Sequence, residues 1–155
     1  MIREARLEDV NRIGELMGEF TQESLGKYDF DINLEHCKNI AINYLDSTLI
    51  CEIDNNVVGV LAGEVKENNL DGSKVYHELA WYVKKPYRKY GISLLRELEK
   101  KCKDWGVSHI IVGLMENYKA DKLSELYKRM GYVPMERHLI KTIGGGNGSP
   151  TSKAV

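Results

Sequence analysis

Residues 84–93, KKPYRKYGIS, combine four cations, a proline and a glycine in a spacing that could bind an anion. They precede LLRELEKKCKDW, whose apolar spacing predicts a helix. Where a strand turns into a helix at a glycine, backbone N–H groups and the positive end of the helix dipole point to one place. Gly91 lacks the Cβ that would block a phosphate, and it also permits a positive φ. From spacing alone, a phosphate site and a solvated turn both fit this cationic joint.

The period of the apolar residues predicts the elements that must position the joint. In order, they are a strand in 1–6, helices in 9–20 and 33–45, a hairpin of 48–54 and 57–67, a strand in 74–83, a helix in 91–105, a strand in 108–115, a helix in 120–130 and a strand in 132–143. Residues 21–31 are expected to be a loop. This order is typical of an α+β fold around one mostly antiparallel sheet.

Three of these strands carry specific expectations. The alternation of KVYHELAWYV, residues 74–83, places Glu78 and Tyr82 on one face, and His77 and Trp81 on the other. The stretch 108–115, SHIIVGLM, is β-branched and apolar and is predicted to be a central strand. YVPMERHLIKTI, residues 132–143, is predicted to be the last strand, which could pair across a homodimer.

Composition bounds the class of protein. A chain of 155 residues with 43% hydrophobic and 29% charged residues is ordinary for one soluble globular domain. The net charge of −1 makes a nucleic-acid or membrane surface unexpected. The three cysteines form no C-x-x-C pair and the four histidines are scattered, so no metal site is expected. MIREARLEDV lacks the apolar core of a signal peptide, which favours a reduced, cytoplasmic protein.

The end of the chain differs in composition from the rest. Residues 144–155, GGGNGSPTSKAV, are rich in glycine and serine and have no apolar spacing. Such composition is typical of a flexible tail. We therefore expect one domain over residues 1–143 and a tail over 144–155.

Two motifs, in this order, resemble those of the GNAT superfamily of N-acetyltransferases. V-x-x-P-Y-R-x-x-G-I-S-L-L, residues 83–95, resembles motif A, whose core R/Q-x-x-G-x-G/A corresponds to Arg88, Gly91 and Ser93. Ser93 departs from the family's glycine or alanine, but it is small and its hydroxyl could donate to a phosphate. LSELYKRMGYVP, residues 123–134, resembles motif B. The resemblance covers residues 1 to about 142 and implies an α+β fold, an α/β sandwich whose central mixed, mostly antiparallel sheet of six to seven strands is flanked by about four helices.

The resemblance implies acetyl-CoA as the acyl donor and no metal. In this family the backbone amides of the joint bind the pyrophosphate, and the preceding strand runs along the pantetheine arm. A backbone N–H at Tyr82 or Val83 would stabilise the oxyanion. The donor-binding residues that the resemblance implies are Trp81, Tyr82, Val83, Arg88, Lys89, Tyr90, Gly91, Ile92 and Ser93.

Two side chains match catalytic positions of the family. Acetyl transfer to an amine needs a base, because a lysine-like amine has a pKa of about 10.4, and it gains from an acid at the departing thiolate. Tyr127 matches the acid of many members, although it also continues an apolar helical stripe with Leu123 and Met130. Glu78 lies where the family often places the base, although an exposed strand residue is an equal alternative. His77 points to the other face and is interpreted as structural.

The family commonly shapes its acceptor site with the loop between the first two helices. Here that loop carries Tyr28 and Asp29, followed by Phe30 and Asp31. Rings and carboxylates would suit a cationic amine, and a solvated acidic loop fits equally well. Tyr82 is expected to line the same acceptor pocket, because its predicted face is that of Glu78.

The resemblance thus implies an acetyl-CoA-dependent N-acetyltransferase that acts on a primary amine of a small molecule or peptide in a ternary complex. One alternative is a GNAT-fold module that binds acyl-CoA without turnover. A second is a nucleic-acid-binding module at the cationic joint, for which a net charge of −1 is a poor electrostatic footprint.

Overall fold

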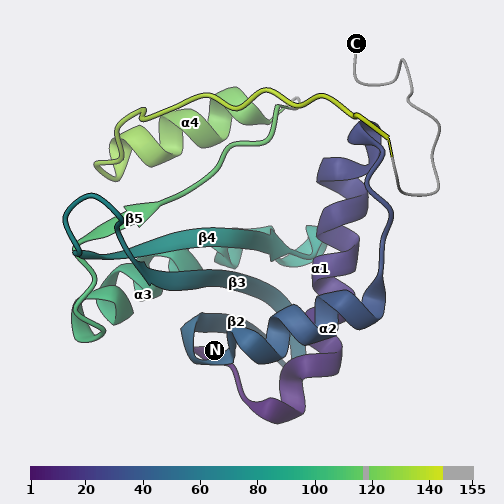
Figure 1. Ribbon diagram of the computed structural model, residues 1–155. Coiled ribbons are helices and arrows are strands. Elements are labelled where there is room, and N and C mark those ends of the chain that lie inside the picture. Colours follow the sequence, from purple (N-terminus) through teal and green to yellow (C-terminus); the bar gives the residue numbers. More distant parts are fainter. Residues whose placement is uncertain (117–118, 145–155) are drawn as a thin grey trace.

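A five-stranded sheet in the order β1-β2-β3-β4-β5 forms the centre of the protein. The computed structural model describes residues 1–116 and 119–144 (Figure 1). Strands β1 to β4 pair antiparallel with their neighbours and β5 pairs parallel with β4, which confirms a mixed, mostly antiparallel sheet. The strands are β1 (Ile2–Glu4), β2 (Thr48–Ile53), β3 (Asn56–Glu67), β4 (Lys74–Val83) and β5 (His109–Ile111).

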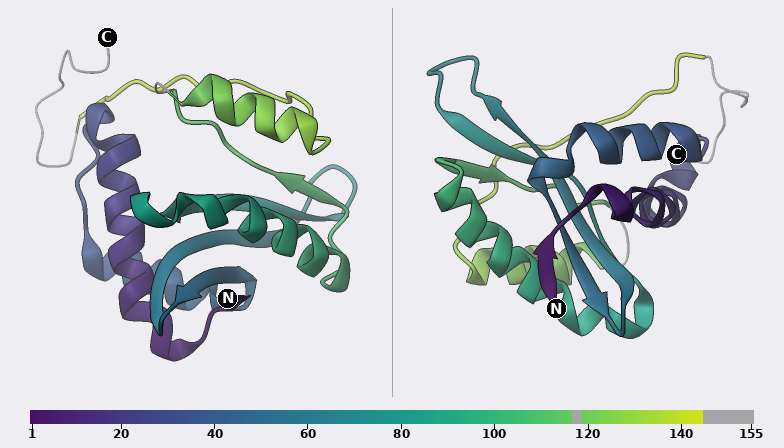
Figure 2. Two further views of the ribbon diagram at one scale, coloured as in Figure 1. Left: turned by 180° about the vertical axis from the view of Figure 1, so that it is seen from behind. Right: turned by 90° about the horizontal axis from the view of Figure 1, so that it is seen from below.

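Helices cover both faces of this sheet. α1 and α2 pack on one face, and α3 and α4 pack on the other (Figure 2). The α-helices are α1 (Val10–Leu25), α2 (Leu34–Asn43), α3 (Gly91–Asp104) and α4 (Ala120–Arg129). Short 3₁₀ helices lie in the connections between strands and helices: η1 (Leu7–Asp9), η2 (Gly26–Tyr28), η3 (Leu45–Ser47) and η4 (Lys85–Tyr90). The layers agree with the predicted α+β class.

Each face of the sheet has its own apolar core. Under α1 and α2, Ile13, Leu16 and Val60 are completely buried, because the spacing of 13 and 16 puts both on the sheet side of α1. Under α3, Leu94 and Leu98 are buried in the same way. The two cores hold β3 and β4 rigidly between the helical layers, so residues at the end of β4 have a defined position.

The first helix is longer than its apolar pattern predicts. α1 continues to Leu25 and passes directly into η2, whereas residues 21–31 are expected to be a loop. The polar residues after Phe20 lie on exposed turns of the helix, and Thr21 donates its hydroxyl to the Met17 carbonyl at 2.9 Å. The prediction fails because a polar stretch without proline or an internal glycine can continue a helix without contributing to the core. The N-cap of α2 is Asn33, whose side chain accepts from the His36 N–H at 3.0 Å.

The last part of the sheet also differs from the prediction. β5 is a three-residue strand at the end of the described sheet, not a central strand. Residues 132–144 contain no strand, so the described residues form five strands, not six to seven. The apolar side chains of this segment do not pack against a core: Val133, Met135 and Leu139 are 81%, 73% and 99% exposed. The expected tail lies almost wholly in residues 145–155, outside the described residues.

Candidate active site

A β-bulge in β4 determines which side chains face each other at the site. Ala62 of β3 pairs with Ala80, whereas the next residue, Gly63, pairs with Glu78, so Leu79 is an extra residue in β4. The extra residue inverts the alternation of side chains from that point onward. The prediction that Glu78 shares a face with Tyr82 is therefore wrong.

The bulge places Glu78 on the face of the sheet that α3 and α4 cover. Tyr127 and Trp81 belong to the apolar cluster of that face, whereas Tyr82 belongs to the cluster under α1. His77 alternates with Glu78 and takes the opposite face, as the sequence predicts.

The edge of β4 is open beside this face. β4 and β5 pair only between residues 75–77 and 109–111. Beyond this point the chain after β5 rises from the sheet toward α4 (Figure 1), and the described residues provide β4 with no second strand from Glu78 to Val83. The peptide groups of an open strand edge can bind an extended ligand that carries amides of its own.

Glu78 and Tyr127 meet at this opening. The Tyr127 hydroxyl donates to Glu78 Oε2 at 3.3 Å, and the backbone N–H of Gly113 also donates to the Glu78 carboxylate. Burial raises the pKa of Glu78 to about 7, and the two hydrogen bonds oppose this shift. Burial, together with the nearby Glu78 carboxylate, also raises the pKa of Tyr127. The pair therefore contains a carboxyl group that exchanges its proton near neutral pH and a phenol that keeps its proton.

The Tyr127 ring packs against two aromatic neighbours, Trp81 and Tyr132. Only 3% of its surface is exposed. Its ring centroid lies 5.8 Å from that of Trp81 and 5.2 Å from that of Tyr132, whose hydroxyl donates to Glu99 of α3 at 3.1 Å. The ring thus packs in the core, as the apolar stripe predicts, and the hydroxyl points to Glu78.

The cationic joint is helical. η4 spans Lys85–Tyr90 and passes into α3 without a break, and Gly91 has a φ of −59°. Gly91 therefore does not use the positive φ that glycine permits, because the 3₁₀ turn reaches the helix without a left-handed residue. The Gly91 N–H donates to the Arg88 carbonyl, and a Cβ at Gly91 would lie 3.4 Å from the Trp81 ring. The first turn of α3 has no acidic residue and no side-chain cap.

Two cations of the joint, Arg88 and Lys84, contact acidic residues of α1. The Arg88 guanidinium donates from Nε to the Val83 carbonyl at 3.2 Å and from Nη2 to Glu23 at 3.1 Å. Lys84 Nζ lies 3.7 Å from Glu19. Of the remaining residues expected to bind the donor, Lys89 extends over the Tyr90 ring, and Ile92 and Ser93 are exposed.

Trp81 connects the joint to the Glu78–Tyr127 pair. Its ring contacts both Gly91 and Tyr127. The indole Nε1 is buried and has no hydrogen-bond partner. A buried donor without a partner is costly in a folded protein. This N–H is therefore available to an acceptor from outside the described chain.

On the opposite face, Tyr82 contacts two glutamates that the sequence did not identify. Its hydroxyl lies 3.0 Å from Glu19 Oε2 and 3.1 Å from Glu23 Oε1. Burial, with these carboxylates, raises the pKa of Tyr82. The two glutamates are one helical turn apart, but Glu23 falls in the segment that was expected to be a loop. Extending the helix past Phe20 would have identified the pair.

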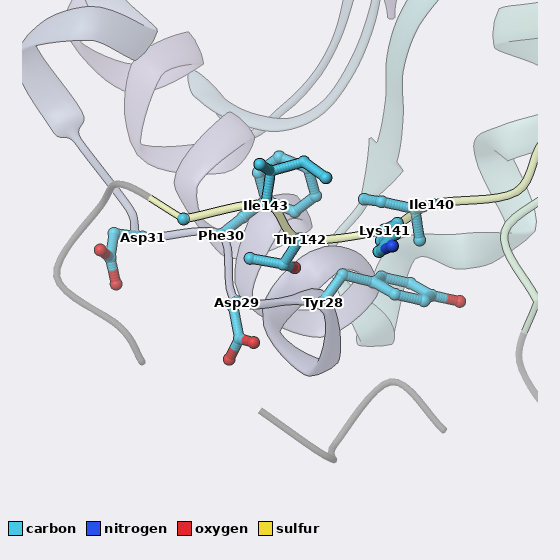
Figure 3. Close-up of a pocket in the computed structure, with 9 residues that line it drawn as sticks. Tyr28, Asp29, Phe30, Asp31, Ile140, Lys141, Thr142 and Ile143 are labelled. Atoms are coloured by element: carbon cyan, nitrogen blue, oxygen red, sulfur yellow. The ribbon is translucent and has the colours of Figure 1, made fainter. Parts of the chain in front are cut away.

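Tyr28 and Asp29 line a pocket of about 380 Å³, but Tyr82 is not part of its wall (Figure 3). The other wall is the C-terminal segment 140–144, whose participation the sequence did not indicate. The Asp29 and Asp31 carboxylates extend away from the aliphatic side chains of Ile140 and Ile143 (Figure 3). Asp29 Oδ2 is buried without a hydrogen-bond partner. The pocket thus combines aromatic, aliphatic and acidic groups.

The segment after β5 connects this pocket to the Glu78–Tyr127 pair. Gly113 donates its N–H to Glu78, and the Glu116 carbonyl accepts from Lys27 Nζ, next to Tyr28. Three residues of extended chain span at most about 11 Å. Lys27, the neighbour of the pocket residue Tyr28, and Glu78 of the candidate catalytic pair therefore contact the two ends of one short segment.

In residues 1–116 and 119–144, no group of three or more His, Cys, Asp and Glu side chains could hold a metal ion. The cysteines Cys37, Cys51 and Cys102 are free, and the last two are buried. No helix in the described part of the chain has the length and apolar content to cross a membrane.

Residues 10–132 match the Acetyltransferase (GNAT) family. The match spans most of the 155 residues, so the chain belongs to this family and is an acyltransferase. The family uses acetyl-CoA, as the sequence motifs imply.

Solved acetyltransferase structures have the same fold. A possible acetyltransferase from Clostridium difficile 630 is 17% identical, with a TM-score of 0.70 over 93% of this chain and 98% of that one. Ribosomal-protein-alanine N-acetyltransferase from Brucella melitensis biovar Abortus 2308 is 17% identical, with a TM-score of 0.71 over 92% and 98%. The aminoglycoside N-acetyltransferase AAC(6')-Iy, solved with CoA, is 11% identical, with a TM-score of 0.70 over 92% and 93%. No curated protein sequence matches the chain.

Proposed function

We propose that the protein transfers the acetyl group of acetyl-CoA to a primary amine of a small molecule or peptide, with both substrates bound together. The observation that carries the proposal is the Glu78–Tyr127 pair at the open edge of β4, 3.3 Å between its oxygens. Acetyl-CoA supplies an activated acetyl group as a thioester. The chain supplies a base, an acid and donors that hold the two substrates.

Glu78 Oε2 receives the proton of the amine. A base is most effective when its pKa is near the working pH, and burial raises the pKa of Glu78 to about 7. Tyr127 Oη donates a proton to the departing thiolate, because its raised pKa keeps it protonated. Since the two oxygens share a hydrogen bond, Glu78 can return a proton to Tyr127 after each turnover.

The donor fits the groups along β4 and the joint. The unpaired edge of β4 from Glu78 to Val83 can pair with amides of a pantetheine arm. The unsatisfied Trp81 Nε1 supplies a further donor, and Arg88, Lys89 and the first turn of α3 supply positive charge for a diphosphate. These residues therefore fit acetyl-CoA.

For the acceptor we propose a cationic amine at the pocket of Tyr28 and Asp29. Asp29 Oδ2 has no hydrogen-bond partner, which an ammonium N–H would supply, and the Tyr28 ring can contact a cation through its face. Tyr82 is left out of this pocket, since its hydroxyl is directed to Glu19 and Glu23.

The test is thiol release from acetyl-CoA with a panel of amines. Steady release that depends on an amine supports the function. Tight binding of CoA without release for any amine would support the alternative of a module that binds acyl-CoA without turnover. Asp29→Asn should raise KM for a cationic acceptor and leave that for acetyl-CoA unchanged; equal effects on both would remove Asp29 from the acceptor site.

A further inference from the structure

Arg88 and Glu23 form a contact that the proposed function does not use. Arg88 Nη2 lies 3.1 Å from Glu23 Oε2, and the side chains are 34% and 54% exposed. The other Glu23 oxygen, Oε1, lies 3.1 Å from the Tyr82 hydroxyl. Glu23 therefore contacts a residue of the cationic joint and a residue of β4 at once.

This contact lies on the wrong side of the sheet for a diphosphate. Glu23 belongs to α1, and Tyr82 packs in the core under α1. Trp81, with its unsatisfied Nε1, packs in the core under α3 and contacts Gly91, where that helix begins. The Nη2 group that would bind a phosphate beside Gly91 is thus directed to a carboxylate on the opposite face.

We propose that Glu23 competes with the donor's diphosphate for the Arg88 guanidinium and so lowers the affinity for acetyl-CoA. The inference rests on the proposed function, because it takes Arg88 as a diphosphate ligand. When the diphosphate binds, Arg88 Nη2 leaves Glu23 and turns to the face of Trp81. Glu23 keeps its contact with Tyr82 and loses its cationic partner.

The expected size of the effect follows from the exposure of the pair. Ion pairs between exposed side chains contribute little, so breaking this pair should change CoA affinity by about two- to fivefold. Substitution of Glu23 by Gln removes the charge but keeps an oxygen that accepts from Tyr82. Glu23→Gln should therefore bind CoA about two- to fivefold more tightly than the wild type.

The chain contains a closely matched control. Arg12 and Glu15, also on α1, form an ion pair at 2.7 Å with side chains 34% and 53% exposed. Glu15→Gln removes the same charge from the same helix without touching the joint. It reports any general gain in affinity for an anionic ligand when α1 loses a negative charge.

The experiment is calorimetric titration of CoA into the wild type, Glu23→Gln, Glu15→Gln, Arg88→Ala and the Glu23→Gln/Arg88→Ala double variant.

A gain in CoA affinity in Glu23→Gln but not in Glu15→Gln, which disappears when Arg88 is also replaced, supports the competition. Unchanged or weaker binding by Glu23→Gln, an equal gain in Glu15→Gln, or a gain that persists without Arg88 would overturn it. If Arg88→Ala binds CoA like the wild type, Arg88 is not a diphosphate ligand and the competition is excluded. If the wild type does not bind CoA, the proposed function fails and the competition fails with it.

Discussion

Replacement of Glu78 by Gln tests the proposed base directly. The exchange keeps the shape of the side chain and an oxygen for the Tyr127 hydroxyl, but the amide cannot take a proton. Loss of a positioned acid–base group lowers the rate by about 10²–10⁴-fold. We therefore expect kcat/KM of Glu78→Gln to fall by this factor at pH 8, with CoA affinity unchanged.

The pH profile makes the test specific. With a pKa of about 7, Glu78 is roughly one-tenth deprotonated at pH 6 and nine-tenths at pH 8. The ionisation of the acceptor amine is common to both enzymes. The ratio of kcat/KM between wild type and Glu78→Gln should therefore rise about tenfold from pH 6 to pH 8. Glu64→Gln, a change to a half-buried glutamate of β3, serves as the control.

Stability gives an independent measurement of the same pKa. The unfolded chain loses the Glu78 proton near pH 4.5, whereas the folded protein keeps it to about pH 7. The stability that this group contributes is thus fully present below pH 4.5 and is lost as the pH rises to about 7. The loss is at most about 3 kcal/mol, since each pKa unit corresponds to about 1.4 kcal/mol. The unfolding free energy of the wild type, relative to Glu78→Gln, should fall by up to this amount between pH 4.5 and 7.

Two results would refute the reasoning about Glu78. One is a turnover rate of Glu78→Gln equal to that of the wild type at every pH, which would mean that water suffices as the base. The other is a ratio of rates and a difference in unfolding free energy that both stay constant between pH 4.5 and 8. In that case the carboxyl group would not have the raised pKa that its burial requires.

Three further substitutions test other parts of the site and the fold. Tyr127→Phe should lower kcat by about 10²-fold or more with an unchanged melting temperature. Normal turnover by this variant would show that Tyr127 only packs in the core. Trp81→Phe removes the unsatisfied indole N–H and should weaken CoA binding by up to about tenfold in calorimetry. Unchanged affinity would show that the indole N–H does not bind CoA. Gly63→Ala would force a Cβ into the buried Tyr76 ring and should lower the unfolding free energy by about 1–3 kcal/mol. In the control Gly26→Ala the new Cβ meets open space, so the unfolding free energy should not fall in this way. Equal unfolding free energies of the two variants would contradict the prediction.

Local patterns predicted much of the fold because each helix and strand buries one face. The spacing of Ile13 and Leu16, and of Leu94 and Leu98, predicts α1 and α3 together with the faces that they bury. Apolar spacing predicted the hairpin of 48–54 and 57–67, although its turn lies at Asp54 and Asn55, one residue earlier than these bounds imply. The pattern failed at 132–143, where alternation alone does not supply a partner strand.

The sequence by itself determined most of the elements, the cationic joint and, through two motifs, the family. These features are local, because spacing along one segment decides them. Only the tertiary structure decided that Glu78 faces Tyr127 and not Tyr82, since the extra residue Leu79 appears only when β4 is paired with β3. It also decided the partners of Arg88 and the raised pKa of Glu78. Folding brings Glu23, 65 residues away in the sequence, to Arg88, and it buries Glu78 beside Tyr127, 49 residues away.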